Sequence, residues 1–414
     1  MTDVSQQLDQ LLQGAADVIS RPELVERLSS GRRLRVKLGL DPTASDLHLG
    51  HAVVLRALRR FQDAGHVAVL IVGDFTAQVG DPTGKSVTRP RLSKNEVDDA
   101  AETYVEQVTK VLDPDPDRLE IRRNSEWLSA MGMEDVLRLT ARSTVARMLE
   151  RNDFAARYQA GSAISLTEFM YPLLQGWDSV MVQADVELGG TDQLFNLLMG
   201  RHLQSQEGQP QQVVITTPIL VGLNGPDLDG PKMSKSLGNY VGLSDSPNEQ
   251  FGKVYSIPDA LIDTYAQHAT GWEQAQIDEF VALRAMGEVS PNVAKRMVAS
   301  AVVDLYHGQG AGAAAETEYN WVHVEKKTPT DLATTDVAMI PARFGPTPEV
   351  AQLIAHQGWV SLTEARRLVA QGGVRLDEVI VAVGATVALE DLPGQILRLG
   401  KRRAATYVGT PALS

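Results

Sequence analysis

The chain of 414 residues contains no cysteine, so it forms neither disulfide bonds nor thiolate metal sites. Aromatic residues make up only 5% of it, and no apolar run approaches the roughly 20 residues that a membrane-spanning helix needs. Residues 1–7 lack the basic region that opens an export signal. These absences predict a protein of the reducing cytoplasm with no membrane anchor.

Positive charge is scarce overall, because 39 Lys and Arg face 52 Asp and Glu and leave a formal net charge of −13. Such a balance at first argues against a nucleic-acid partner. The distribution is uneven, however, since residues 341–414 carry eight Lys or Arg against six Asp or Glu. An acidic body with a mildly basic C-terminal segment can still bind RNA through local patches. An apolar content of 43% is ample for the cores of two or three domains.

The first informative motif is His-Leu-Gly-His at 48–51. It follows a strand-like alternation over 34–40, and apolar residues recur at helical spacing from about 49 to 62. His48 and His51 are therefore expected in the first turn of a helix, three residues apart on one side. The free N–H groups of a first turn favour an anion, and imidazole donors add hydrogen bonds where phosphate charge develops. Gly50 between them would let a flat base approach the backbone.

The second motif, Lys-Met-Ser-Lys-Ser at 232–236, lies between glycines that indicate a mobile loop. The ammonium groups of Lys232 and Lys235 and the hydroxyls of Ser234 and Ser236 can close on a polyphosphate. Such a loop would stabilise a leaving pyrophosphate without covalent chemistry. The two motifs together indicate attack of a carboxylate on the α-phosphate of ATP.

Both motifs also admit simpler interpretations. Two histidines on one helix face can be ordinary surface residues, and two lysines can form a solvated charge cluster. A zinc pair is a further alternative, although no cysteine and no third histidine lies at ligand spacing. The stretch 80–86 looks like a phosphate-binding P-loop, but it has three residues between its glycines where that motif has four.

At the level of families, the two motifs resemble the motif pair of class I aminoacyl-tRNA synthetases. More closely, the chain resembles tyrosyl-tRNA synthetases of the longer bacterial branch over nearly its whole length. Four segments carry the resemblance: 37–51, 73–86, 167–178 and 188–193. The resemblance implies ATP-dependent activation of tyrosine to tyrosyl-adenylate and its transfer to tRNA(Tyr). It also implies Mg²⁺ bound with the ATP substrate, no tightly bound cofactor, and a homodimer.

The order of predicted elements favours an α/β fold class for residues 1–225. A helical segment over about 3–30 precedes the first strand, and the continuously apolar stretch 66–72 is typical of a buried parallel strand. Further strands near 118–122 and 182–188 alternate with helices. This alternation predicts a doubly wound, Rossmann-type parallel sheet with its site at the carboxyl ends of the strands.

Beyond the catalytic domain, residues 226–325 are expected to form a mostly helical domain that includes the lysine-rich loop. Residues 326–346, rich in Lys, Thr, Pro and Asp, predict a linker. In 347–414, a capped basic helix, a glycine turn and a strand resemble a small ribosomal-protein-like RNA-binding domain of the α+β class. The basic residues expected to contact tRNA are Arg366, Arg367, Arg375, Lys401, Arg402 and Arg403.

The resemblance assigns roles at the nucleotide end of the site. The charge of the pentacoordinate phosphate would be stabilised by His48, His51, Lys232 and Lys235, with Thr43 assisting. By resemblance, Gly50, Asp192 and Ser234 complete the ATP site. Asp192 would bind the ribose of the adenylate.

The amino-acid end is expected on a helix opened by the capping box at 165–168. Tyr171, Gln175 and Asp178 form one polar stripe at i, i+4 and i+7, a pattern that also suits a plain solvated face. Pro172 predicts a kink or a later helix start. By resemblance, Tyr171 and Gln175 join Asp81 around the α-ammonium, Asp178 accepts the phenol hydroxyl, and Gln193 approaches the carboxylate. Members of the other branch carry a phenol-binding Tyr at the position of Lys37.

Alternative functions come from three directions. A tryptophanyl-tRNA synthetase is the runner-up within the class, disfavoured by Asp178 and by the C-terminal segment. A small-molecule adenylyltransferase shares the His-x-Gly-His site but has no use for a basic C-terminal domain. A non-catalytic RNA-binding protein could retain the fold, but the intact 232–236 motif argues against it.

Overall fold

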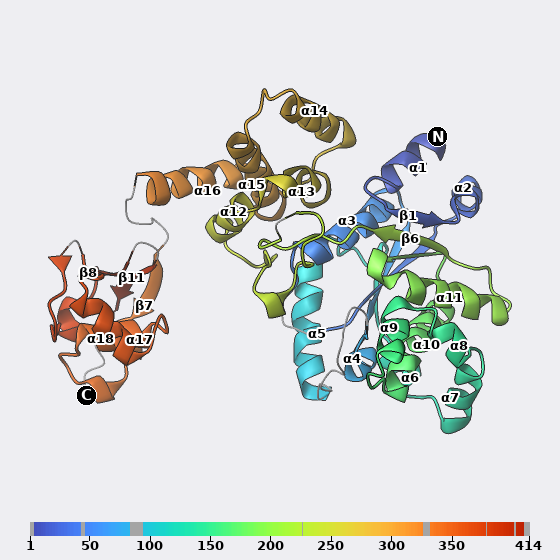
Figure 1. Ribbon diagram of the computed structural model, residues 1–414, viewed down its shortest axis with the longest axis horizontal. Helices are drawn as coiled ribbons and strands as arrows, with labels where there is room; N and C mark the ends of the chain where they lie inside the picture. Colours follow the sequence, from blue (N-terminus) through green and yellow to red (C-terminus); the bar gives the residue numbers. More distant parts are fainter. Residues whose placement is uncertain are drawn as a thin grey trace. The chain divides into compact units, whose positions relative to one another are not determined.

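The computed structural model describes residues 4–42, 46–82, 94–225, 227–325, 332–377, 379–400 and 403–409. The chain divides into two compact units, Met1–Ala313 (unit 1) and Ala314–Ser414 (unit 2), shown in Figure 1. No helix in the described part of the chain is long and apolar enough to cross a membrane.

Unit 1 is organised by a six-stranded sheet with the order β1-β6-β5-β2-β3-β4. Strand β1 runs antiparallel to β6, and all other neighbours are parallel. The strands are β1 Asp17–Ile19, β2 Arg35–Leu40, β3 Val67–Val72, β4 Leu119–Arg123, β5 Val186–Gly190 and β6 Val213–Thr217. The parallel strands have the doubly wound order, with the topological switch point between β2 and β5. The predicted Rossmann-type sheet is confirmed.

Helices surround this sheet and continue beyond it (Figure 1). Those up to β6 are α1 Val4–Leu11, α2 Arg21–Ser29, α3 Leu49–Asp63, α4 Thr76–Val79, α5 Lys94–Val108, α6 Ser125–Leu128, α7 Met133–Thr140, α8 Val145–Met148, α9 Asn152–Gln159, α10 Leu166–Met181 and α11 Leu194–Gln206. After β6 follow α12 Pro247–Tyr255, α13 Ile262–Ala269, α14 Gln274–Ala285, α15 Pro291–His307 and α16 Ala311–Tyr319, which crosses into unit 2.

Two local predictions about these elements need correction. The segment 3–30 is not wholly helical, because Asp17–Ile19 forms the edge strand β1 against β6. A three-residue strand defined by a partner about 200 residues away leaves no local pattern to detect. Helix α10 begins at Leu166 as the capping box predicts, and Pro172 lies inside it rather than delaying its start. The Ser165 hydroxyl accepts from the backbone and Glu168 reaches back to the Ser165 N–H, 2.9 Å away.

The core of unit 1 explains why β3 is continuously apolar. All residues from Ala68 to Val72 are buried, as in a strand covered on both faces. Val69 and Ile71 join a core cluster with Leu173 and Leu174 of α10 and with residues of α11. Helices α10 and α11 pack side by side, and α11 also contacts β5 and β6.

The strand register places the carboxyl ends at one edge. Leu40 at the end of β2 is paired with Val72 at the end of β3, which is paired with Arg123 of β4. On the other side β2 pairs with β5, whose Gly190 is paired with Thr217 of β6. The residues that follow these ends therefore meet at one edge of the sheet.

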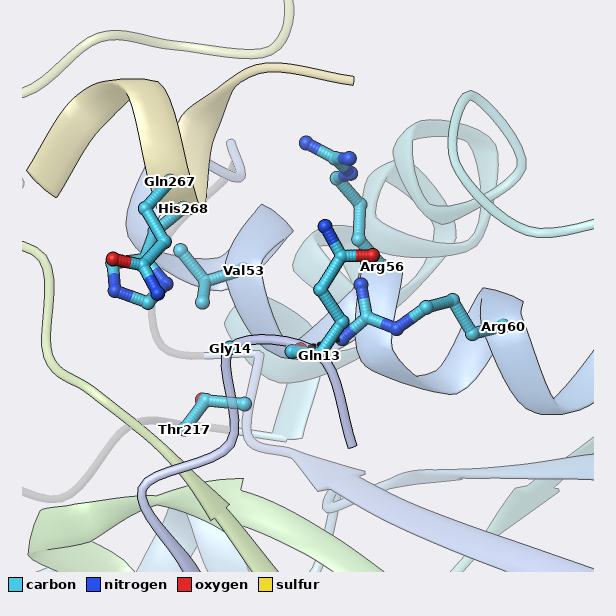
Figure 2. A pocket seen from close by; sticks show the side chains of 8 residues that line it. All are labelled: Gln13, Gly14, Val53, Arg56, Arg60, Thr217, Gln267 and His268. Atoms are coloured by element: carbon cyan, nitrogen blue, oxygen red, sulfur yellow. Dashed lines mark hydrogen bonds between the residues drawn. The ribbon is translucent and has the colours of Figure 1, made fainter. Parts of the chain in front are cut away.

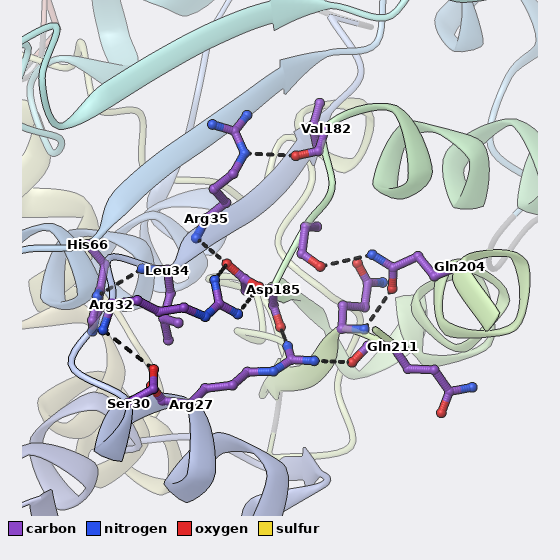
Figure 3. A network of polar contacts seen from close by, with 12 residues as sticks. Arg27, Ser30, Arg32, Leu34, Arg35, His66, Val182, Asp185, Gln204 and Gln211 are labelled. Carbon is purple, nitrogen blue, oxygen red and sulfur yellow. Dashed lines mark hydrogen bonds and ion pairs between the residues drawn. The ribbon is translucent and has the colours of Figure 1, made fainter. Parts of the chain in front are cut away.

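The opposite edge is fastened by a polar network around Asp185, which precedes β5 (Figure 3). Arg32 donates to its carboxylate over 2.9 Å, and the Arg35 N–H at the start of β2 also donates over 2.9 Å. Arg27 of α2 donates to the carbonyls of Asp185 and Gln211. This network ties α2 to the amino ends of β2 and β5, so we assign it a structural role.

Unit 2 has its own five-stranded sheet, in the order β7-β11-β10-β8-β9. Its elements are a π-helical turn Asn320–Val324, β7 Ala333–Asp336, α17 Val350–His356, α18 Leu362–Ala370, β8 Val374–Leu376, β9 Val379–Ile380, β10 Ile396–Leu399 and β11 Arg403–Val408. Residues of both helices and of β8, β10 and β11 form one apolar cluster.

Part of the predicted linker at 326–346 belongs to this sheet. Strand β7 pairs in parallel with β11, from Ala333 opposite Ala405 to Asp336 opposite Val408. Short 3₁₀ turns follow at Val337–Met339 and Ala342–Phe344. A composition rich in polar residues and proline does not reveal a pairing with a strand some 70 residues away, so the linker prediction does not hold for this stretch.

Candidate active site

The two histidines of the first motif cap helix α3 and hold each other in place. His48 is the N-cap residue, and its Nδ1 accepts from the Gly50 N–H at 3.2 Å. The His48 N–H donates to Nδ1 of His51 at 3.3 Å, and the two ring centroids are 4.0 Å apart. Because both Nδ1 atoms accept, each neutral ring carries its proton on Nε2. Both imidazoles therefore retain an Nε2–H that can donate to a phosphate oxygen.

Electrostatics keep both rings neutral near pH 7. Burial, followed by the neighbouring charges of His51, Lys235 and Lys232, lowers the pKa of His48 to about 2. Burial and the same two lysines lower the pKa of His51 to about 4. The described residues include no group of three or more His, Cys, Asp or Glu side chains that could hold a metal ion. The pair is thus suited to hydrogen-bond donation rather than to charge.

Gly50 has a packing role that the sequence did not predict. A Cβ on Gly50 would lie 3.0 Å from Nδ1 and from Cε1 of His48. Contacts this short are rare, so any side chain here would displace the His48 ring from its cap. The absence of a side chain at 50 therefore permits the histidine arrangement itself.

The Lys-Met-Ser-Lys-Ser motif is anchored by hydrogen bonds from the backbone N–H groups of Met233 and Ser234. The Met233 N–H donates to the Leu220 carbonyl at 2.9 Å, and Met233 is buried. The Ser234 N–H donates to Oδ1 of Asn239 at 2.8 Å, and Asn239 itself is 2% exposed. Lys235 begins a 3₁₀ turn, Lys235–Leu237, that ends at Gly238 with a left-handed φ of 64°. The two lysine side chains thus project from a fixed backbone.

The chain brings the two motifs together although about 180 residues separate them. The Leu49 N–H donates to the Val241 carbonyl at 3.0 Å, and the Leu243 N–H donates to the Leu47 carbonyl at 2.9 Å. Lys235 Nζ lies 2.6 Å from an Asp46 carboxylate oxygen, just before the first motif. Lys232 Nζ lies 2.9 Å from Oδ2 of Asp192, the predicted ribose ligand. Two imidazole donors and two ammonium groups therefore share one region at the sheet edge.

Two of the residues predicted to bind an α-ammonium, Asp81 and Tyr171, also lie close together, since the charge of Asp81 acts on the Tyr171 hydroxyl. Gln193 Nε2 donates to Asp81 Oδ2 at 2.8 Å, and the Tyr171 hydroxyl donates to Asp41 Oδ2 at 2.9 Å. Asp41 follows β2 directly and was not among the predicted site residues. Burial is the main cause that raises its pKa to about 7, and the negative charges of Asp81 and Asp178 add to it. The negative charges around Asp41 favour a bound cation at this position.

A second glycine makes the Asp41 contact possible. The Thr76 hydroxyl donates to Asp41 Oδ1 at 2.7 Å across the position of Gly73. A Cβ on Gly73 would lie 2.0 Å from that oxygen and 2.4 Å from the Thr76 hydroxyl. Gly73, which follows β3, therefore lets Asp41 pair with Thr76.

Asp178, the predicted phenol acceptor, is 3% exposed and is held by two donors. Trp127 Nε1 donates to its Oδ1 at 2.8 Å, and Asn124 Nδ2 lies 3.2 Å from its Oδ2. Burial raises the pKa of Asp178 to about 7, while Lys37 and these two hydrogen bonds oppose that rise. Sequence reasoning missed Asn124 and Trp127. The sequence feature that could have revealed Asn124 is its position directly after the strand β4, because residues that follow parallel strands meet at the carboxyl edge of the sheet.

Not every predicted site residue can be placed. Thr43, Lys401 and Arg402 lie outside the described residues. Gln175 is partly buried on α10, and its carbonyl accepts from Lys37 Nζ at 3.0 Å. Most of the stretch 80–86 that looks like a P-loop is also outside the described residues.

The predicted RNA-binding residues of unit 2 that are described lie at its surface. Arg366, Arg367, Arg375 and Arg403 are all exposed. Arg366 pairs with Glu349 on α17's N-cap, with its Nη2 2.6 Å from Oε2, and Arg367 pairs with Glu364 on its own helix. Exposed ion pairs of this kind contribute little to stability and exchange readily for another anion.

Unit 1 also contains a small pocket, shown in Figure 2. Arg60 of α3 donates there to the Gln13 carbonyl at 2.6 Å, and burial lowers the pKa of His268 to about 4. None of the predicted site residues lines it. The lining residues are Gln13, Gly14, Val53, Arg56, Arg60, Thr217, Gln267 and His268.

Comparison with known proteins decides the family. Residues 29–323 match the family of class I tRNA synthetases (W and Y). A tyrosine–tRNA ligase of Symbiobacterium thermophilum is 48% identical over 411 residues, which cover 98% of each chain. One from Thermotoga maritima is 44% identical over 96% of each chain. The chain belongs to the tyrosine–tRNA ligase family.

Solved structures support the same fold. The crystal structure of tyrosyl-tRNA synthetase from Archaeoglobus fulgidus complexed with L-tyrosine is similar with a TM-score of 0.61 at 22% identity. The similarity covers 76% of this chain and 99% of that one. A C-terminally truncated mitochondrial tyrosyl-tRNA synthetase of Aspergillus nidulans has a TM-score of 0.62 at 23% identity, over 77% and 94%. Together with the tyrosine–tRNA ligase relatives, the family match decides against the tryptophanyl, adenylyltransferase and purely RNA-binding alternatives.

Proposed function

We propose that the residues gathered at the carboxyl edge of the sheet carry out the first step of the family's reaction. The chain is an aminoacyl-tRNA ligase that activates tyrosine with ATP and charges tRNA(Tyr). The observation that carries the residue-level proposal is the joining of the two motifs, by backbone hydrogen bonds between 47–49 and 241–243. It sets phosphate donors beside a cluster of carboxylates suited to an amino acid.

In the proposed arrangement, the tyrosine carboxylate attacks the α-phosphate of ATP, and pyrophosphate leaves. Neutral His48 and His51 donate from Nε2, and Lys232 and Lys235 supply positive charge, where negative charge develops on the phosphate oxygens. Lys232 would exchange its contact with Asp192 for phosphate, which frees Asp192 for the ribose hydroxyls. ATP enters as its Mg²⁺ complex, with the ion held mainly by phosphate oxygens and water.

At the amino-acid end, we propose that Asp81, Tyr171 and Gln175 bind the α-ammonium, with Asp41 as an additional carboxylate in that group. The hydrogen bond from Tyr171 directs one Asp41 oxygen toward this cluster. Gln193 would approach the carboxylate from its position beside Asp81. Asp178 accepts the phenol hydroxyl, fixed in orientation by Trp127 and Asn124.

The proposal of tyrosine as the activated amino acid is tested by ATP–pyrophosphate exchange with each of the twenty amino acids. We expect exchange with tyrosine to exceed that with every other amino acid by orders of magnitude, since a site built around a hydroxyl acceptor rejects analogues that lack it. A tyrosine-independent exchange, or a stronger response to tryptophan, would contradict the assignment.

For unit 2 we propose tRNA binding. Arg375 of β8 stands directly opposite Arg398 of β10 in the antiparallel register. Two guanidinium groups on neighbouring strands place positive charge together, where a phosphate group can contact both. The exposed Arg366, Arg367 and Arg403 extend the positive charge of this small α+β domain.

Truncation separates the two steps of the reaction. We expect a protein ending at Glu325, before the segment that leads into β7, to exchange pyrophosphate with tyrosine at nearly the full rate but to charge tRNA poorly. Pyrophosphate exchange and tRNA aminoacylation are measured on the same preparations at several salt concentrations. The full-length enzyme should lose tRNA affinity as salt rises, because phosphate contacts release counterions. Undiminished charging by the shortened protein would show that unit 2 does not bind the tRNA.

We further propose a homodimer in the cytoplasm. Large apolar side chains are exposed in one stretch of the chain, among them Met133, Leu137, Val145 and Leu166. Exposed apolar groups of this number favour association with another protein surface. The absence of cysteine suits a reducing compartment.

A further inference from the structure

Lys37 is the least expected charged residue near the site. Its side chain lies on β2 and is fully buried, with 0% exposure. Nζ donates to Glu187 Oε1 at 2.6 Å, to Ser179 Oγ at 2.8 Å and to the Gln175 carbonyl at 3.0 Å. These three acceptors use all three donors of an ammonium group. Lys37 therefore has no hydrogen left for a substrate phenol.

The partner carboxylate is equally engaged. Glu187 on β5 also accepts from Ser179 Oγ at 3.0 Å and from Gln212 Nε2. Burying an ion pair is costly unless its hydrogen bonds are complete, and a well-packed apolar pair is often as stable. A buried pair that is fully satisfied, directly behind residues of the substrate site, calls for a reason other than stability.

The position of Lys37 relative to Asp178 supplies that reason. Its two contacts on α10 are Gln175 and Ser179, which lie three residues before and one residue after Asp178. Lys37 does not bond to Asp178, whose oxygens are held by Trp127 and Asn124. Among nearby charges, Lys37 is the largest influence that lowers the pKa of Asp178, and the opposing influence of Glu187 is the smallest cause. The ion pair thus presents its positive end to Asp178.

We propose that Lys37 is a positioning residue for the selection of tyrosine over phenylalanine. It fixes the turn of α10 that carries Asp178 against β2 and β5, and its charge favours the ionised form of the Asp178 carboxylate, which is the stronger acceptor for the phenol hydroxyl. This inference rests on the proposed role of Asp178. It explains how a lysine without a free donor can still serve the phenol end of the site.

The predicted signature is a pH dependence of selectivity. An ionised Asp178 accepts a strong, charge-assisted hydrogen bond from the phenol and is costly to leave unpaired beside phenylalanine, whereas a protonated Asp178 forms a weaker bond and costs less to leave unpaired. Selectivity should therefore rise with pH through the pKa of Asp178, near 7 in the free enzyme. Removing the positive charge of Lys37 should raise the pKa of Asp178 and move the rise in selectivity to higher pH.

Other ionisable groups face Asp178, and the measurement must distinguish their titration from that of Asp178. They are Lys37 on β2, Glu187 on β5, Asp41 after β2 and Tyr171 on α10. Asp41 also has a pKa raised to about 7, so a rate profile for tyrosine alone would mix two titrations. The ratio of kcat/KM for tyrosine to kcat/KM for phenylalanine removes the contribution of Asp41, because both substrates carry the same ammonium and carboxylate.

The test measures this ratio by pyrophosphate exchange from pH 6 to 9 in the full-length enzyme. We expect the double variant Lys37→Met/Glu187→Gln, which keeps volume and leaves no buried charge unpaired, to move the midpoint upward by about one pH unit or more. The control Ser179→Ala loses a hydrogen bond to Lys37 but no charge, and its midpoint should stay at the parent value. A double variant with an unchanged midpoint would overturn the inference.

A second variant guards against a double variant that does not fold. Glu187→Gln keeps the bonds from Lys37 to α10 and removes the negative end of the pair, so its midpoint should move downward. An upward shift or no shift contradicts the inference.

The variant Asp178→Asn distinguishes the proposed role of Asp178 from that of Lys37. If it keeps full selectivity, Asp178 is not the phenol acceptor and the proposed function fails at that residue. If it loses selectivity while the Lys37 double variant keeps the parent midpoint, only the role of Lys37 is refuted.

Discussion

Replacing Lys235 by Ala should slow tyrosyl-adenylate formation by about 10²–10³-fold and leave tyrosine affinity nearly unchanged. Lys235 Nζ is held 2.6 Å from Asp46 beside the two histidines, and Lys232 reaches Asp192 in the same way. Because charge on the phosphate oxygens grows only as the transition state forms, a lost ammonium donor should affect the rate more than ground-state binding. The tyrosine contacts that we propose for Asp81, Tyr171 and Asp178 do not involve the 232–236 motif.

Pre-steady-state adenylate formation and equilibrium tyrosine binding, measured on the same variant, check this expectation. Lys253 provides a matched control, because its Nζ lies 5.4 Å from the Tyr240 ring centroid and Lys235 Nζ lies 5.8 Å from the same ring. Lys253 pairs with Asp245 at 2.7 Å, outside the motif, so Lys253→Ala should form adenylate at close to the parent rate. Equal rates for Lys235→Ala and the parent would remove the loop from the mechanism.

The histidine cap shows what local sequence can predict. The pattern before and after 48–51 places a strand, a turn and a helix, and the i, i+3 spacing already sets His48 and His51 on one side of the first turn. The structure adds that they cap each other through Nδ1, which fixes the tautomer that a donor to phosphate requires. Helix periodicity is local, so this part of the site was predictable.

Lys37 and Asp41 show where local sequence is insufficient. Lys37 lies in the stretch 34–40, whose strand pattern was recognised, and Asp41 follows it, but the pattern does not say which side chains meet. Lys37 contacts Glu187 about 150 residues away, and Asp41 contacts Tyr171 about 130 residues away. These contacts depend on β2 lying next to β5 and on α10 packing near the strand ends. Only the sheet order and register supply that information, and the same holds for the edge strand β1.

The largest expected change in specificity follows from Asp178. Replacing it by Asn or Ala should erode the preference for tyrosine over phenylalanine by several orders of magnitude. A buried acceptor that a substrate leaves unpaired is costly, and tyrosyl-tRNA synthetases are the standard example of such rejection, with a factor of about 10⁵ that we adopt from that class. In this chain the proposed acceptor, Asp178, is 3% exposed and fixed by Trp127 and Asn124, so no water compensates easily for a missing hydroxyl. The ratio of kcat/KM for the two amino acids in pyrophosphate exchange measures the effect.

Asp74 offers the matched control for this change. It is 6% exposed, follows β3 at the same sheet edge, and accepts from the Ser125 N–H at 2.9 Å and from its hydroxyl. Replacing Asp74 by Asn removes a buried carboxylate that does not hydrogen-bond to Asp178, so it should cost stability while keeping the tyrosine preference. If both variants lose selectivity alike, the loss reports a general disturbance of the edge. If Asp178→Asn retains the full preference, other residues recognise the phenol. Lys37 is not one of them, because its ammonium already donates to Gln175, Ser179 and Glu187.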